Sequence, residues 1–106
     1  MIISEILTSE AILTSIKASS KKRVLQEISV GISNVYGLNQ SEVFLALQER
    51  EDLGPTGMGH GVAIPHARIS SLKSIKGLFA KLIKSFSLYP NLLHYPRLEL
   101  FYYYYE

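Results

Sequence analysis

A glycine-rich segment followed by a short apolar run restricts the fold of this chain more than any other feature. Four of the seven glycines lie within residues 54–61, and the run Val62-Ala63-Ile64-Pro65-His66 follows at once. Glycines at this density predict a backbone that adopts positive φ angles or passes very close to another group. The three apolar residues indicate a short buried strand, and Pro65 interrupts its hydrogen-bond ladder because proline has no N–H. The segment therefore predicts a glycine loop and a strand, with His66 at the mouth of the strand.

His66 is the candidate reactive residue of this segment. Histidine changes its protonation near neutral pH, and a neutral imidazole nitrogen can act as a nucleophile toward phosphorus. Such a reaction requires one ring nitrogen to carry a lone pair while an acceptor fixes the N–H of the other. The backbone N–H groups of Gly57, Gly59 and Gly61 could hold the phosphoryl oxygens. The alternative is that His66 only ends a strand and bonds to a neighbouring carbonyl.

Two arginines could offset the charge of a bound phosphoryl group. Arg68 follows His66 by two residues, and Arg50 lies in the charged stretch Glu49-Arg50-Glu51-Asp52. On spacing alone, the simpler interpretation of Arg50 is a solvated residue at a charged helix end. Arg68 is closer in sequence, but an arginine in a loop is usually just exposed.

Other ligand motifs fit the glycine segment poorly. His60 and His66 have no Cys, Asp or Glu within the loop that could complete a set of metal ligands. His60-Gly61 stands where a Walker A loop requires Lys-Ser/Thr, and Val62 stands where a dinucleotide-binding loop requires its third glycine. We therefore expect no metal ion and no cofactor.

Composition sets further limits on the class of protein. The chain has 106 residues, 47% of them hydrophobic, with a net charge of +2 and no cysteine. This length allows one domain, and the absence of cysteine excludes disulfides and thiolate metal sites. The charge is too small to favour nucleic acid, and Lys21-Lys22-Arg23 is better explained as a solvated patch than as a nucleic-acid contact. With no signal peptide and no apolar span of about 20 residues, we expect a cytoplasmic protein without membrane insertion.

Hydrophobic periodicity predicts three helices before the glycine segment. The first begins at Thr8 or Ser9, the second begins near Ser19 or Ser20, and the third has Asn39 as its N-cap. Their apolar stripes are, in order, Ile12, Leu13 and Ile16; Val24, Leu25, Ile28, Ile32, Val35 and Tyr36; and Val43, Phe44 and Leu47.

After His66, a polar connection over residues 69–74 leads to a second predicted strand over residues 75–82. From about residue 83 the composition changes. Residues 83–106 hold six of the seven tyrosines, contain no Gly or Ala, and end in Phe101-Tyr102-Tyr103-Tyr104-Tyr105-Glu106. The tyrosine run has high β-propensity, but no partner pattern in the sequence explains it.

The run from Leu7 to Leu82 resembles the type-2 IIA domain of the bacterial phosphoenolpyruvate-dependent phosphotransferase system (PTS), and most of all its nitrogen-regulatory branch, IIA-Ntr. The residues that carry the resemblance are Leu53-Gly54, Gly57-Met58-Gly59-His60-Gly61 and Val62-Ala63-Ile64-Pro65-His66, with support from residues 17–22, 49–51 and 77–82. The resemblance implies an α/β fold, a mixed sheet covered by helices. It also implies that His66 is the phosphorylated histidine, that Arg50 lies near it, and that the phosphoryl donor is a small HPr-like carrier.

The last residues depart from the family pattern. The resemblance implies further strands, a second active-site histidine and closing helices after residue 82, and His94 does not stand in the context of that histidine. We therefore interpret residues 1–82 as a partial IIA domain and residues 83–106 as a non-family tail, produced by truncation or a frameshift. Loss of the following strands would leave the strand at 75–82 with an unpaired edge.

Two functions remain open from the sequence. The first is a phosphocarrier of the nitrogen-regulatory type, in which His66 is the nucleophile and Arg50, Arg68 and the glycine backbone stabilise the phosphoryl group. Its output would be regulation through protein contacts. The alternative is a non-catalytic remnant or interaction module that keeps part of the IIA surface and is not phosphorylated.

Overall fold

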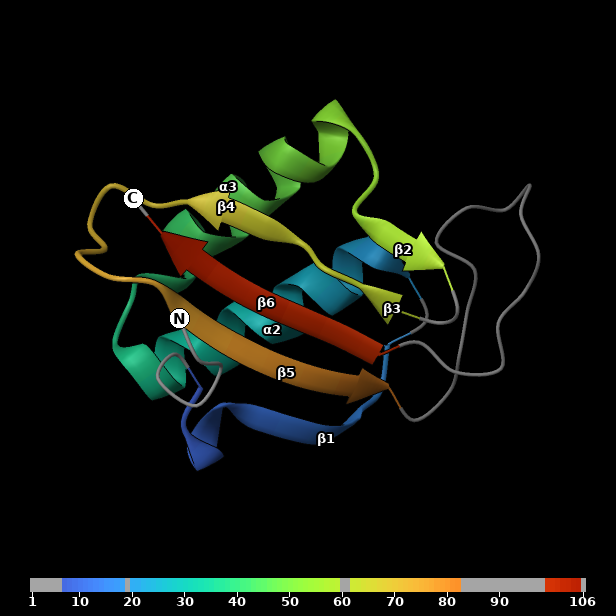
Figure 1. Cartoon of the computed structure of the whole chain (residues 1–106), viewed down its shortest axis with the longest axis horizontal. Coiled ribbons are helices and arrows are strands. Elements are labelled where there is room, and N and C mark those ends of the chain that lie inside the picture. The colour runs from blue at the N-terminus through green and yellow to red at the C-terminus, as the bar shows by residue number, and fades with distance from the viewer. Residues whose placement is uncertain (1–6, 19, 60–61, 83–98, 106) are drawn as a thin grey trace.

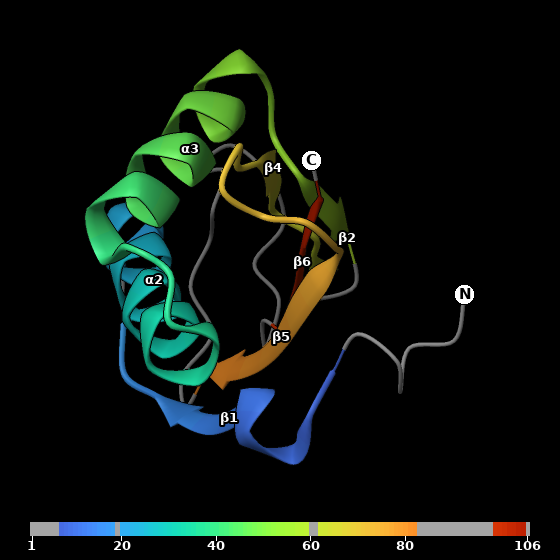
Figure 2. The ribbon, with the colours of Figure 1, turned by 90° about the vertical axis from the view of Figure 1, so that its left-hand side faces the viewer.

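The computed structural model describes residues 7–18, 20–59, 62–82 and 99–105. These residues form two layers, a mixed sheet and a pair of helices that cover one face of it (Figures 1 and 2). The helices are α2 (Lys21–Tyr36) and α3 (Gln40–Leu53), and a single 3-10 turn, η1 (Ser9–Ala11), precedes the first strand. The predicted α/β class, a mixed sheet flanked by helices, is confirmed.

The sheet mixes parallel and antiparallel pairs. Its strands are β1 (Ile12–Ile16), β2 (Gly57–Gly59), β3 (Val62–Ala63), β4 (His66–Arg68), β5 (Lys76–Leu82) and β6 (Glu99–Tyr105). Among the described residues their order is β1-β5-β6-β3-β2, and β4 continues along the same edge of β6 as β3. β6 is antiparallel to β5 and parallel to both β3 and β4, whereas β1 is parallel to β5. β6 therefore lies between β5 and the strand that carries His66 (Figure 1).

The two long helices begin and end where local chemistry predicts. The Ser20 side chain accepts a hydrogen bond from the Arg23 N–H at the start of α2, and the Asn39 side chain accepts one from the Glu42 N–H at the start of α3. Gly37 ends α2 with a φ of 71°, a left-handed conformation that glycine adopts without a Cβ clash. Both predicted helix starts are confirmed.

The core lies between the helices and the sheet. Each helix turns its apolar stripe toward the strands, with Val43 and Leu47 buried from α3 and a longer stripe buried from α2. β5 supplies the sheet side through Leu78, Ala80 and Leu82. The buried stripe of α2 comprises Val24, Leu25, Ile28 and Ile32, whereas Val35, Tyr36 and, on α3, Phe44 are half-buried.

The prediction of a first helix over residues 8–16 is wrong, because these residues form the 3-10 turn and strand β1. The positions of Ile12, Leu13 and Ile16 suit a helical stripe, but they suit a short strand as well. Tertiary pairing decides the outcome, since Ile12 pairs with Phe79 and Leu13 with Ala80 in a parallel ladder. The β-branched residues of this stretch also favour a strand.

The prediction of an unpaired edge on the strand at 75–82 is also wrong. β5 pairs with β1 on one side and with β6 on the other, and its pairing with β6 runs from Lys76–Tyr104 to Lys81–Glu99. The tyrosine run thus has a partner in the sheet, which the sequence pattern did not reveal. Residues 99–105 belong to the same sheet as the strands before residue 82.

Candidate active site

His66 is the first residue of β4, directly after a break in the sheet edge. β3 ends at Ala63, the buried Pro65 follows, and the backbone pairs with β6 again at His66, opposite Tyr103. A proline at this point cannot donate to the ladder, so the strand is interrupted there. The break leaves the half-buried His66 side chain beside the C-terminal end of α3.

One ring nitrogen of His66 has a defined partner. Nδ1 lies 3.0 Å from the carbonyl oxygen of Ile64. A carbonyl can only accept, so this contact requires the proton on Nδ1 and, in the neutral ring, leaves the lone pair on Nε2. Nucleophilic attack by an imidazole requires this arrangement, in which an acceptor holds one N–H and the other nitrogen carries the lone pair.

A pocket of about 340 Å³ gathers the predicted charged residues around this imidazole. Its lining includes Arg50 from α3 together with His66 and Arg68 from β4. Ala46, Glu49 and Leu53 also line it from α3, and Leu53 is 85% exposed. Residues 16 positions apart in the sequence are therefore brought to one cavity by the packing of α3 against β4.

Arg50 is held in place at the end of α3. Its Nη1 donates to the carbonyl oxygen of Gly54 at 3.0 Å, and the residue is half-buried. The bond satisfies a carbonyl just beyond the helix end, and the positive charge lies where the helix dipole is negative. Arg50 is thus a half-buried, hydrogen-bonded cation in the lining of the His66 pocket.

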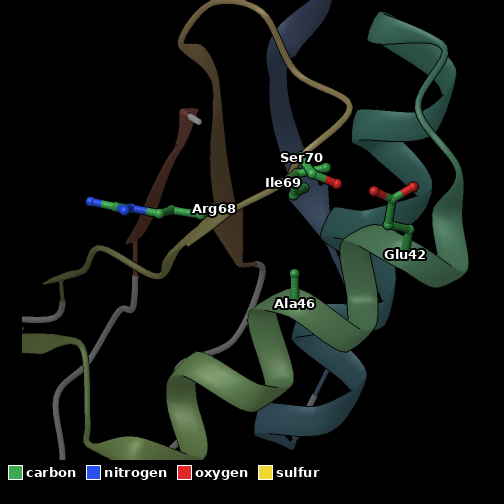
Figure 3. Close-up of a pocket in the computed structure, with 5 residues that line it drawn as sticks. All are labelled: Glu42, Ala46, Arg68, Ile69 and Ser70. Carbon is green, nitrogen blue, oxygen red and sulfur yellow. The ribbon is translucent and has the colours of Figure 1, made fainter.

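Arg68 lies at the boundary of two pockets. It lines the His66 pocket and also a neighbouring one of about 520 Å³ with Glu42, Ala46, Ile69 and Ser70. Figure 3 shows its side chain extending away from Glu42 and Ala46. Arg68 is exposed, as expected for an arginine near a loop.

The predicted glycine loop is partly a strand. Gly57 and Gly59 lie on β2, which pairs with β3 in an antiparallel ladder. Gly61 and His60 lie outside the described residues. The glycine density predicted either positive φ angles or a close approach to another group, and Gly54 does not adopt the left-handed conformation. Instead, Gly54 has an extended φ of 167°.

A buried carboxylate, which the sequence argument did not single out, supports the segment before β2. The Glu51 side chain is 3% exposed and lies 3.0 Å from the Nζ of Lys21, at the start of α2. Its two oxygens accept hydrogen bonds from the backbone N–H of Thr56, at 3.2 Å, and from the Thr56 hydroxyl, at 2.6 Å. This network ties the beginning of α2 and the end of α3 to the chain that enters β2.

The sequence of the chain is similar to that of known proteins. Residues 5–88 match the model of the family described as "Phosphoenolpyruvate-dependent sugar phosphotransferase system, EIIA 2". The chain belongs to this family. A nitrogen regulatory protein from Bradyrhizobium diazoefficiens is 45% identical over 82 residues, which are 77% of this chain and 54% of that protein. One from Klebsiella oxytoca is 37% identical over 82 residues, 76% of this chain and 50% of that protein.

Solved structures agree with the family assignment. The nitrogen regulatory protein IIA-Ntr from Neisseria meningitidis superposes with a TM-score of 0.83 at 33% identity, over 96% of this chain and 69% of that one. IIA mannitol from Escherichia coli shares the fold, with a TM-score of 0.71 at 18% identity, over 90% of this chain and 70% of that one. The chain spans about half the length of the curated relatives it matches.

The described part of this EIIA domain has neither a cluster of metal ligands nor a membrane-spanning helix. Across residues 7–18, 20–59, 62–82 and 99–105, no group of three or more His, Cys, Asp or Glu side chains is placed to hold a metal ion. No helix among the described residues has the length and apolar character that crossing a membrane requires.

The basic cluster at residues 21–23 is also accounted for in part. Lys21 pairs with the buried Glu51, and Arg23 pairs with Glu27 one turn along α2 at 2.7 Å. Two of the three cations thus contact carboxylates of the chain itself.

Proposed function

We propose that this EIIA domain is a phosphocarrier that accepts a phosphoryl group on Nε2 of His66. The observation that supports the proposal most strongly is the contact of Nδ1 with the Ile64 carbonyl at 3.0 Å, in a pocket also lined by Arg50 and Arg68. Nδ1 is committed as a donor, so Nε2 is the nucleophilic atom. The family of the chain and its nitrogen regulatory relatives support the same reaction class.

The proposed donor is the phosphohistidine of a small HPr-like carrier protein. The lone pair of Nε2 attacks the phosphorus, an Nε2–P bond forms, and the P–N bond of the donor breaks with its electron pair returning to the donor imidazole. His66 loses no proton in this step, because Nδ1 keeps its hydrogen on the Ile64 carbonyl. The reaction needs no cofactor, only two aligned imidazoles and compensation of the phosphoryl charge.

Arg50 is the proposed main source of that compensation. Its guanidinium is oriented by the Gly54 carbonyl through one of its five N–H donors, and the planar group has further donors for phosphoryl oxygens. Arg68 adds a second, more exposed positive charge at the pocket. Backbone N–H groups of Gly57, Gly59 and Gly61 remain proposed phosphate contacts.

The proposed output is regulatory. The similar proteins from Bradyrhizobium diazoefficiens and Klebsiella oxytoca are called nitrogen regulatory proteins, and a structure with a similar fold is a complex of mannitol enzyme IIA with phosphorylated enzyme IIB from Escherichia coli. We propose that this chain, too, acts through contacts with other proteins in the cytoplasm. The exposed Leu53 in the lining of the pocket is suited to such contacts, because apolar side chains anchor protein interfaces.

Labelling by phosphoenolpyruvate, the first enzyme of the pathway and the HPr-like carrier tests the proposal. We expect transfer to the wild-type chain, none to His66→Ala, and a rate roughly a hundredfold lower for Arg50→Ala, with Arg50→Lys in between. The variants His60→Ala and His94→Ala are matched controls and should be labelled. An unlabelled wild-type chain beside a labelled full-length relative would instead favour the remnant or interaction module.

A further inference from the structure

We infer that Glu51 is a positioning residue for His66, acting through Thr56 and Ile64. The inference rests on the proposed function, because it concerns the orientation of the nucleophile. Glu51 does not line the pocket of His66, and its carboxylate is directed into the protein, where it is nearly inaccessible to water. Its effect must therefore pass through the residues that it binds.

A continuous series of hydrogen bonds connects the two side chains. Both oxygens of Glu51 hold Thr56, one through the backbone N–H and one through the hydroxyl. The carbonyl oxygen of Thr56 accepts from the N–H of Ile64 at 2.9 Å, and the carbonyl oxygen of Ile64 accepts from Nδ1 of His66 at 3.0 Å. Two of these bonds, from the Thr56 N–H to Glu51 and from the Ile64 N–H to the Thr56 carbonyl, hold backbone units.

The peptide units of this series determine the imidazole geometry. The Ile64 carbonyl selects the tautomer and the ring orientation of His66, and the Thr56 carbonyl fixes the Ile64 peptide that carries it. Ile64 and Pro65 lie in the break between β3 and β4, where the ladder to β6 does not hold the backbone. The bond from Thr56 replaces that support, and Glu51 is what anchors Thr56.

Arg50 and Glu51, neighbours at the C-terminal end of α3, contact different parts of the following chain. Arg50 binds the carbonyl of Gly54 and lines the pocket, whereas Glu51 binds Thr56 and faces the interior. Lys21 supplies the counter-charge that a carboxylate at 3% exposure requires. The sequence Arg50-Glu51 therefore fixes both the cation of the site and the segment that orients its nucleophile.

The test combines phosphoryl transfer with ¹⁵N NMR of the His66 imidazole in the whole chain. In the wild type we expect the neutral ring to carry its proton on Nδ1. In Glu51→Gln we expect a mixture of tautomers and a transfer rate roughly ten- to a hundredfold lower. Thr56→Val, which loses only the hydroxyl bond, should give a smaller change in the same direction, and Thr56→Ser should remain close to the wild type.

Asp52→Asn is the matched control, since Asp52 is the next carboxylate along α3 and is exposed. It should leave tautomer and rate unchanged. If Glu51→Gln fails to fold by circular dichroism, Thr56→Val against Thr56→Ser provides the comparison. Wild-type tautomer and rate in a folded Glu51→Gln or, failing that, in Thr56→Val would overturn the inference. A wild-type chain that accepts no phosphoryl group would refute the proposed function, while the NMR comparison would still test the positioning.

Discussion

Replacement of Lys21 by methionine tests the energetic weight of the buried ion pair. Lys21 Nζ lies 3.0 Å from Glu51 Oε1, and the side chains are 32% and 3% exposed, respectively. Removing one partner of a fully buried pair costs about 3–5 kcal/mol, and an exposed pair contributes about 0–1 kcal/mol. Water reaches Lys21 but hardly reaches Glu51, so we expect Lys21→Met to lower the free energy of unfolding by about 2 kcal/mol.

The sign of this effect is informative. Lys21 is the first residue of α2, where a positive charge opposes the helix dipole, so removal of an unpaired lysine there would be neutral or slightly stabilising. Urea unfolding followed by circular dichroism measures the change, with the exposed Lys22→Met as the matched control, expected within about 0.5 kcal/mol of the wild type. In the double variant Lys21→Met/Glu51→Gln, the decrease in the free energy of unfolding should be smaller than the sum of the two single decreases. A Lys21→Met chain as stable as Lys22→Met would refute the reasoning.

Two further substitutions test other contacts. Gly37→Ala should lower the free energy of unfolding by about 1 kcal/mol, because alanine is strained at φ 71° even though no atom lies within 4 Å of the added Cβ. Gly37→Asn should lower the free energy of unfolding by less. Equal decreases for the two variants in urea unfolding would contradict this reasoning. Tyr36→Phe removes the bond of its hydroxyl to the Gly77 carbonyl at 2.6 Å and should cost about 1 kcal/mol at neutral pH. Burial raises the pKa of the Tyr36 hydroxyl, so the stability difference between the wild type and Tyr36→Phe should vanish as the pH rises through that raised pKa. A stability difference that does not change with pH in urea unfolding at alkaline pH would contradict this prediction.

The sequence predicted those parts of the fold that short-range chemistry determines. Ser20 and Asn39 cap their helices, because each side chain acts on backbone atoms within a few residues. The predictions at β1 and β6 depended on partners far away in the chain. Ile12 and Leu13 form a strand because β5 lies beside them, and no local pattern of the tyrosine run reveals its place between β5 and β4.

The candidate site divides in the same way. His66 was singled out because glycines, an apolar run and Pro65 precede it in sequence, and the structure adds the contact of Nδ1 with the Ile64 carbonyl. Arg50 could be assigned only through family resemblance, since nothing in its spacing brings it to the cavity of His66. Glu51 was not predicted, because a carboxylate in a charged stretch of sequence is expected to be exposed, and the burial of Glu51 results from the packing of the helices.

Identification of the atom that carries the phosphoryl group tests the central claim most directly. After incubation with phosphoenolpyruvate, the first enzyme of the pathway and the HPr-like carrier, mass spectrometry would locate the label, and ³¹P and ¹⁵N NMR would identify the nitrogen. We expect one acid-labile phosphoryl group, bonded to Nε2 of His66, with the proton of Nδ1 retained. A phosphoryl group on Nδ1, on another residue, or absent while a full-length relative is labelled would contradict the account.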